Sequence, residues 1–100
     1  MRISIQSSAL QDLRGGFRFY AAKEHGLGDY FLDSLMSDID SLQLFAGIHS
    51  THFGRFHRLL SKRFPYGVYY QISGNEIFVR AVLDLRRDPN WIARKLKGLA

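Results

Sequence analysis

The first half of the chain places its apolar residues first at strand spacing and then at helical spacing. Ile3 and Ile5 alternate with polar neighbours, which predicts a short strand with one buried face. A second set recurs every three or four residues and predicts a helix over 8–25, with Ser7 or Ser8 offering a capping hydroxyl; it comprises Leu10, Leu13, Phe17, Tyr20 and Ala21.

Gly26 follows that stripe and is suited to the left-handed conformation that ends a helix. A further apolar stripe predicts a second helix over 29–45, and it comprises Phe31, Leu35, Ile39 and Leu42. Because the link between the two helices is short, they should form an antiparallel hairpin. Gly15 and Gly16 interrupt the first helix, and close packing of the other helix is the available reason.

The second half of the chain reads as strands. Residues 46–54 predict a loop, and Phe56 to Leu60 predict a strand. One face of the next strand would carry Tyr66, Val68, Tyr70 and Ile72, and one face of the last would carry Ile77, Val79, Ala81, Leu83 and Leu85. The turn between these strands is Ser73-Gly74-Asn75, and Asp88-Pro89 begins a short C-terminal helix. The predicted class is α+β: one domain over 1–100, with an N-terminal strand, a helical hairpin, a three-stranded antiparallel meander and a short helix.

Composition narrows the class of protein. The 100 residues include no cysteine and no 18-residue apolar run, so we expect a cytoplasmic protein without disulfides, a membrane span or a signal peptide. Residues 1–50 hold four basic and six acidic side chains, for a net charge of −2, whereas residues 51–100 hold ten and three, for +7. A basic half of this kind attracts nucleic acid or an acidic protein partner.

Local motifs in the second half resemble those of the RelE/ParE toxin superfamily, and the resemblance covers essentially the whole chain. Residues 56–60 (FHRLL) look like a family strand of the form x-R-h-h, where h is apolar, and residues 63–72 (RFPYGVYYQI) are similar to the FPY-x-h-x-Y-x-h strand of the ParE-like, plasmid-stabilisation members. Residues 77–89 look like those members' closing strand, with Asp84 where many carry histidine. The family fold has the same order of elements that the periodicity predicts.

Departures from the family pattern separate its two branches. The RNA-cleaving RelE branch uses basic residues on the meander, and two of these would fall at Leu60 and Gly67 here. Arg58 and Arg87 do match basic positions, whereas the branch's C-terminal tyrosine has no counterpart and the nearest aromatic residue is Trp91. RNA cleavage needs an acid or base and positive charge at the phosphate. The resemblance therefore favours the ParE-like branch, whose members inhibit DNA gyrase by binding.

The candidate surface for a target or an antitoxin is mainly basic, because arginine binds carboxylates and phosphates in a bidentate fork. It comprises Arg58, Arg63, Tyr69, Arg80, Arg87, Trp91 and Lys95. Tyr69 is included because it should lie on the strand face opposite Tyr66 and Tyr70, which are expected in the core. Arg58 and Arg87 are also the catalytic candidates if the chain is RelE-like. We expect Arg86 to pair with an acidic neighbour.

No metal site or cofactor is expected. His49, His52 and His57 lack the carboxylate or cysteine partners of a metal site, so we interpret them as ordinary polar side chains. What the resemblance implies is the toxin of a type II toxin–antitoxin pair, bound by a cognate antitoxin and directed at gyrase. A ribosome-dependent mRNA endoribonuclease and a non-toxic antitoxin-binding module remain as alternatives, as do a homodimer and a toxin–antitoxin hetero-oligomer.

Overall fold

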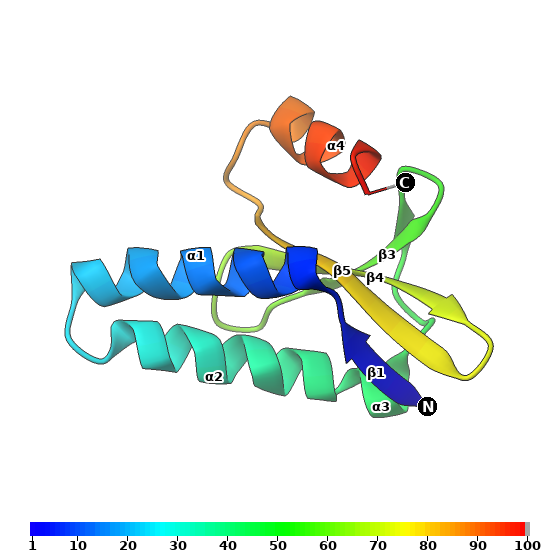
Figure 1. Ribbon diagram of the computed structural model, residues 1–100, viewed down its shortest axis with the longest axis horizontal. Coiled ribbons are helices and arrows are strands. Elements are labelled where there is room, and N and C mark those ends of the chain that lie inside the picture. The colour runs from blue at the N-terminus through cyan, green and yellow to red at the C-terminus, as the bar shows by residue number, and fades with distance from the viewer. Residues whose placement is uncertain (100) are drawn as a thin grey trace.

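A helical hairpin and a C-terminal helix lie on opposite sides of one mixed β-sheet in the computed structural model, which describes residues 1–99 (Figure 1). The α+β class and the order of the main elements agree with the sequence prediction. No helix within residues 1–99 is long and apolar enough to cross a membrane. The elements are β1 (Arg2–Ile5), α1 (Ser7–Lys23), α2 (Leu27–Asp40), α3 (Leu42–Phe45), β2 (Thr51–His52), β3 (Phe56–Leu60), β4 (Tyr66–Ser73), β5 (Glu76–Asp84) and α4 (Pro89–Lys97).

The sheet has the strand order β1-β5-β4-β3-β2, in which β1 runs parallel to β5 and all other neighbours are antiparallel. The predicted meander is therefore β3, β4 and β5, with Gly74 in a left-handed conformation at the β4–β5 turn. The segment predicted as a loop, 46–54, contains the two-residue strand β2. The second predicted helix divides at Ser41 into α2 and the single turn α3.

The prediction that Ser7 or Ser8 caps α1 is wrong. The N-cap is Gln6, without a side-chain capping bond, and the Ser8 hydroxyl instead donates to the Arg80 carbonyl at 2.6 Å. One turn further along α1, an Asp12 carboxylate oxygen accepts from the Val82 N–H at 3.0 Å. Strand β1 ends at Ile5, so these two α1 side chains satisfy the backbone of β5 where its strand partner has stopped.

The prediction that a single face of β5 carries all its alternating apolar residues is also wrong. The β4–β5 register shifts between Tyr69 and Tyr70, whose partners are Ala81 and Val79, so Arg80 is an extra residue on β5. A bulge of this kind reverses the side-chain alternation. Residues 77 and 79 therefore face the helical hairpin, whereas residues 81 and 83 face α4.

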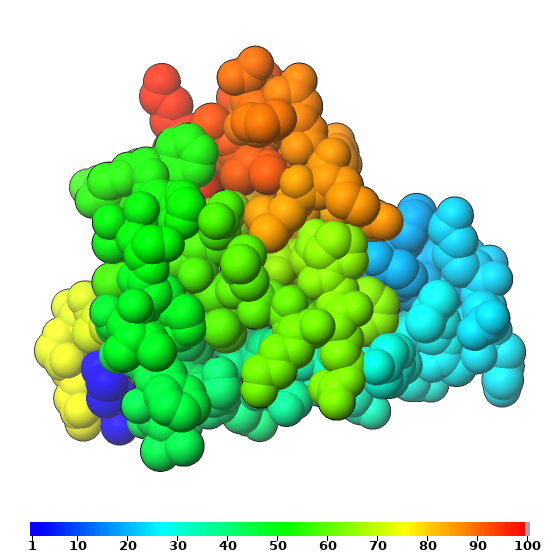
Figure 2. Space-filling model, turned by 180° about the vertical axis from the view of Figure 1, so that it is seen from behind, coloured from blue at the N-terminus to red at the C-terminus, as the bar shows by residue number. Residues whose placement is uncertain are grey.

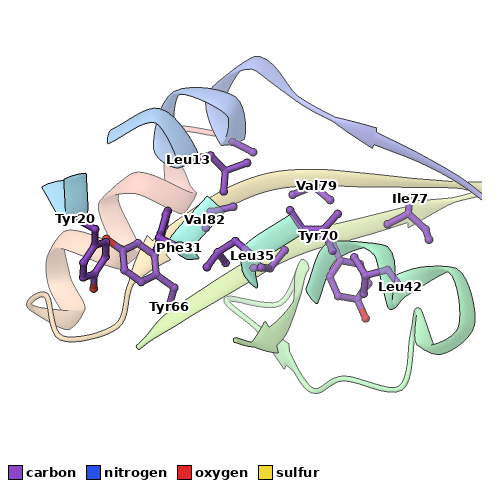
Figure 3. Close-up of a cluster of buried hydrophobic side chains, with 13 residues drawn as sticks. Leu13, Tyr20, Phe31, Leu35, Leu42, Tyr66, Tyr70, Ile77, Val79 and Val82 are labelled. Atoms are coloured by element: carbon purple, nitrogen blue, oxygen red, sulfur yellow. The ribbon is translucent and has the colours of Figure 1, made fainter. Parts of the chain in front are cut away.

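Two apolar cores result, one on each side of the sheet. The larger lies under the hairpin, and Figure 3 shows Tyr20, Phe31 and Tyr66 together at one end of it. The Phe31 ring packs directly on Gly16, because a Cβ at that position would overlap its Cζ and Cε2 atoms. Close helix packing is therefore the reason for Gly16. The smaller core lies under α4 and comprises Phe56, Tyr69, Ala81, Leu83, Ile92 and Leu96.

Candidate functional site

The α4 side of the sheet gathers most of the basic residues that the sequence singled out. Helix α4 begins as predicted, with Pro89 in its first turn and the Asp88 carboxylate accepting from the Asn90 N–H at 2.8 Å. Ile92 and Leu96 are its buried residues, so the helix is fixed to the sheet and its basic residues Arg94, Lys95 and Lys97 remain exposed.

Three of the predicted site residues form one stack. The Arg87 guanidinium carbon lies 3.9 Å from the centre of the Trp91 ring, and the Lys95 ammonium nitrogen lies 5.4 Å from it. Trp91 and Lys95 are one helical turn apart on α4, and Arg87 precedes the helix. The ring attracts both cations through cation–π interactions and so gathers them at one place on the surface. The structure thus joins residues that the sequence could only name separately.

Arg58 lies on the same side of the sheet, with its side chain across a glycine. It pairs with Tyr69 in the β3–β4 register, and directly opposed residues share a sheet face. A Cβ at Gly67 would meet both the Arg58 side chain and Leu85 at 3.2 Å, so the absence of a side chain at Gly67 makes room for the Arg58 stem. The Arg58 Nε atom is buried without a hydrogen-bond partner. The Arg58 side chain as a whole is half-buried on this basic face, and a guanidinium group there is a candidate for pairing with an anionic partner.

The two departures from the RelE pattern are cross-strand neighbours. Leu60 pairs with Gly67 in the β3–β4 ladder. A side chain at position 67 would press on the Arg58 stem and on Leu85, because its Cβ would lie 3.2 Å from both, whereas Leu60 is exposed beside it. This part of the face therefore presents an aliphatic group where a ribonuclease of that branch would carry positive charge.

Tyr69 is not a surface residue, contrary to the prediction. It does lie on the face opposite Tyr66 and Tyr70, but α4 covers that face and leaves Tyr69 only 1% exposed. Alternation along a strand gave the correct face, and only the packing of α4 decided that this face is a second core. The expected burial of Tyr66 and Tyr70 is confirmed, and burial raises the pKa of Tyr66 to about 12.

Arg80 and Arg63 have separate environments. Arg80 donates to the Gln71 side-chain oxygen at 2.8 Å and to the Leu99 carbonyl at 2.6 Å, so it joins the sheet to the segment after α4. Arg63 is exposed in the loop between β3 and β4. Arg86 pairs with Asp84 at 2.8 Å, as expected, and this hydrogen bond lowers the pKa of the Asp84 carboxyl.

His49 and His57 hold the loop after α3 against Tyr70 through hydrogen bonds and ring packing. His57 stacks on Tyr70, and its Nδ1 hydrogen-bonds the His49 carbonyl at 2.9 Å. His49 in turn hydrogen-bonds the Tyr70 hydroxyl, which also accepts from the Gly47 N–H at 3.0 Å. Burial, with a smaller effect of His57, lowers the pKa of His49. Within residues 1–99 no three side chains of the histidine, cysteine, aspartate or glutamate type are placed to hold a metal ion.

A second candidate region, which the sequence did not predict as a site, lies on the helical hairpin. It is an apolar groove of about 610 Å³ lined by Ile5, Leu10, Leu13, Arg14, Phe17, Arg18, Leu32 and Met36. Arg14 and Arg18 are one turn apart on α1 and both are exposed. The sequence signal for it is that Leu32 and Met36 widen the apolar stripe of the second helix. An apolar floor beside two cations fits an amphipathic acidic helix.

Comparison with known proteins shows that the fold of this chain occurs in a solved structure. No family model matches the sequence, and no curated protein matches it. The α+β arrangement is nevertheless a known one: a chain in a solved structure described as the chromosomal ParDE TA system from P. aeruginosa is similar to it, with a TM-score of 0.73. The two sequences are 15% identical, and the match covers 85% of this chain and 96% of that chain. The likeness establishes a shared fold.

Proposed function

We propose that this chain is the toxin of a type II toxin–antitoxin pair, of the ParE-like kind, and that it acts in the cytoplasm by binding DNA gyrase. The observation that carries the proposal is the fold shared with a ParDE structure over most of both chains. The motifs of β3 to β5 support the same family. Binding rather than catalysis is supported by the aliphatic and glycine positions at Leu60 and Gly67.

The two candidate regions suit two different partners. The hairpin groove, apolar with Arg14 and Arg18 beside it, suits the acidic amphipathic tail of an antitoxin that orders on binding. The α4 side carries the half-buried Arg58 and the Trp91 ring with Arg87 and Lys95 against it, and this basic and aromatic surface suits the target. Arginine and tryptophan are the residue types that most often dominate the energy of a protein interface.

Induced expression of the chain alone in a bacterial host tests the proposal. We expect growth arrest with intact mRNA, and we expect the purified chain to inhibit supercoiling by gyrase. Arrest with fragmented mRNA and normal supercoiling would instead identify a ribonuclease. Normal growth would indicate a non-toxic antitoxin-binding module.

The α4-side residues are tested by the double substitution Arg58→Ala and Arg87→Ala. Arg87 is exposed and Arg58 is half-buried, and neither belongs to the two apolar cores, so the domain should remain folded while growth arrest and gyrase inhibition weaken. Circular dichroism checks the fold. A charge-matched control is Arg2→Ala with Lys23→Ala, because Arg2 pairs with Glu76 at the start of β1 and Lys23 lies over Phe19 at the far end of α1. Equal loss of toxicity in the control would show that net charge, not this face, is what matters.

A further inference from the structure

The turn between β2 and β3 carries an aromatic residue in a conformation that does not suit it. Phe53 has a φ of 57°, and Gly54 has a φ of 72°. The Arg55 N–H donates to the His52 carbonyl across them, as in a two-residue hairpin turn with both central φ values positive. Asparagine, aspartate or glycine is the usual residue at the first central position, because other side chains crowd the backbone there. Within residues 1–99, Phe53 is the only non-glycine residue with positive φ.

The strained residue is also exposed. The Phe53 side chain is 55% exposed, so burial of its ring in this chain does not compensate for the backbone conformation. The hairpin tip thus carries a large apolar ring whose backbone conformation costs stability and whose surface is only partly buried. Strain of this kind, when the surrounding packing does not explain it, points to a function for the side chain.

A groove separates this tip from α4. It measures about 400 Å³ and is lined by Phe53, Arg55, Phe56, Ala93, Leu96 and Lys97. Phe56 and Leu96 are buried core residues, so they form its apolar floor, and Arg55 and Lys97 are exposed cations. Figure 2 shows the β2–β3 segment (green) and α4 (orange to red) side by side on one face of the molecule. None of the lining residues is acidic.

We propose that this groove binds an acidic protein segment, which packs an apolar side chain against the Phe53 ring and places carboxylates beside Arg55 and Lys97. The aliphatic and aromatic floor suits an apolar side chain, and two cations without a neighbouring acid in the lining provide the charge complementarity. Aromatic residues, phenylalanine included, are enriched at protein interfaces relative to the rest of the surface. This surface is separate from the hairpin groove, and the proposal does not depend on toxicity or on gyrase.

Substitution at position 53 separates a binding role from a folding role. Asparagine tolerates positive φ and removes the ring, so Phe53→Asn should raise the melting temperature and weaken binding together. Phe53→Trp keeps an aromatic ring and should keep the binding. Ile48→Asn is the matched control, because Ile48 is 73% exposed in the preceding loop and does not line the groove.

The binding measurement is a titration of the ¹⁵N-labelled full chain with a synthetic amphipathic peptide of glutamate and leucine, followed by amide NMR. We expect shifts at residues 53–55 and 93–97, with an affinity that Phe53→Asn lowers by about fivefold or more, as for an interface anchor, and that Ile48→Asn leaves unchanged. A single-stranded DNA oligonucleotide is the second probe and should shift these signals less.

Several results would overturn the proposal. Shifts confined to the α1–α2 groove, or no shifts at all, would show that the peptide does not use this surface. Tighter binding of the oligonucleotide at residues 53–55 would assign the groove to nucleic acid. A lower melting temperature for Phe53→Asn would show that the ring stabilises the fold rather than serving a partner.

Discussion

At the scale of single residues, small and polar side chains decide how the elements meet. Because Gly16 has no side chain, the Phe31 ring packs directly against the backbone of α1. Gly67 likewise leaves room for the Arg58 stem on the sheet. Gly28 does the same for the hairpin, since a Cβ there would lie 2.8 Å from the Ala21 Cβ. Gly15 differs from all of these, because a Cβ there would meet no atom within 4 Å.

The adjacent glycines of α1 should therefore respond oppositely to the same substitution. Gly16→Ala should destabilise the fold by about 1–3 kcal/mol, because the added methyl group overlaps a fully buried ring that Tyr20, Phe64 and Tyr66 hold in place. Gly15→Ala should stabilise it by about 0.5–1 kcal/mol, the usual helix preference for alanine. Urea unfolding of both variants measures this. Equal effects at the two positions would mean that α1 and α2 are not packed at Gly16 as described.

At the scale of elements, helix α1 contributes to the core, to the hydrogen bonding of β5 and to a surface groove. Its buried residues Leu13 and Tyr20 form the core with α2 and the sheet, and its Ser8 and Asp12 side chains complete the hydrogen bonding of β5. Its outer residues, among them Leu10, Arg14 and Phe17, line the hairpin groove. Because Leu10 and Arg14 are exposed and lie outside the core, they can be changed without disturbing it.

Under the toxin function proposed above, a charge placed in the groove should separate neutralisation by an antitoxin from toxicity. Leu10 is 40% exposed at the groove, so Leu10→Glu should leave the fold and the growth arrest intact and should repel an acidic antitoxin tail. Co-expression with the antitoxin encoded beside the toxin gene measures this, and we expect rescue of growth to fail. Leu44→Glu is the control, since Leu44 is more exposed and lies outside the groove. Full rescue of the Leu10→Glu strain would place the antitoxin elsewhere.

At the scale of the whole molecule, the sheet divides two surfaces of different character. The hairpin side carries the larger core and the apolar groove, and the α4 side carries the smaller core and most of the basic site residues. The charge asymmetry between the two halves of the sequence thus becomes an asymmetry in space, because most of the basic half belongs to β3, α4 and the loops beside them.

The stability of the whole chain should fall when the pH drops below about 6.5. The pKa values of His49 and His52 are lowered in the fold, chiefly by burial, so the unfolded chain binds more protons just below their ordinary value of 6.5. The free energy of unfolding that these two histidines contribute is therefore fully present above pH 6.5, and it is lost as the pH falls through their pKa values in the folded chain. The raised pKa of Asp12 acts with the opposite sign, in a lower range just above 3.8.

Urea unfolding of the protein at pH 7.5 and pH 5.5 measures this loss. His49→Gln keeps a polar side chain beside Tyr70 and removes one of the two groups whose pKa is lowered, so its loss of stability over the same interval should be smaller. An equal loss in the variant would assign the effect to other groups.

The sequence by itself determined the main elements and their order, because period-two and helical spacing and the glycine and proline positions act within a few residues of one another. It also supplied the resemblance to the RelE/ParE superfamily and the basic residues of the candidate surface. Only the tertiary structure decided that Tyr69 is buried, that the bulge at Arg80 reverses the faces of β5, and that Phe53 stands strained over a groove. Each of these depends on contacts between segments far apart in the chain, which local spacing does not encode.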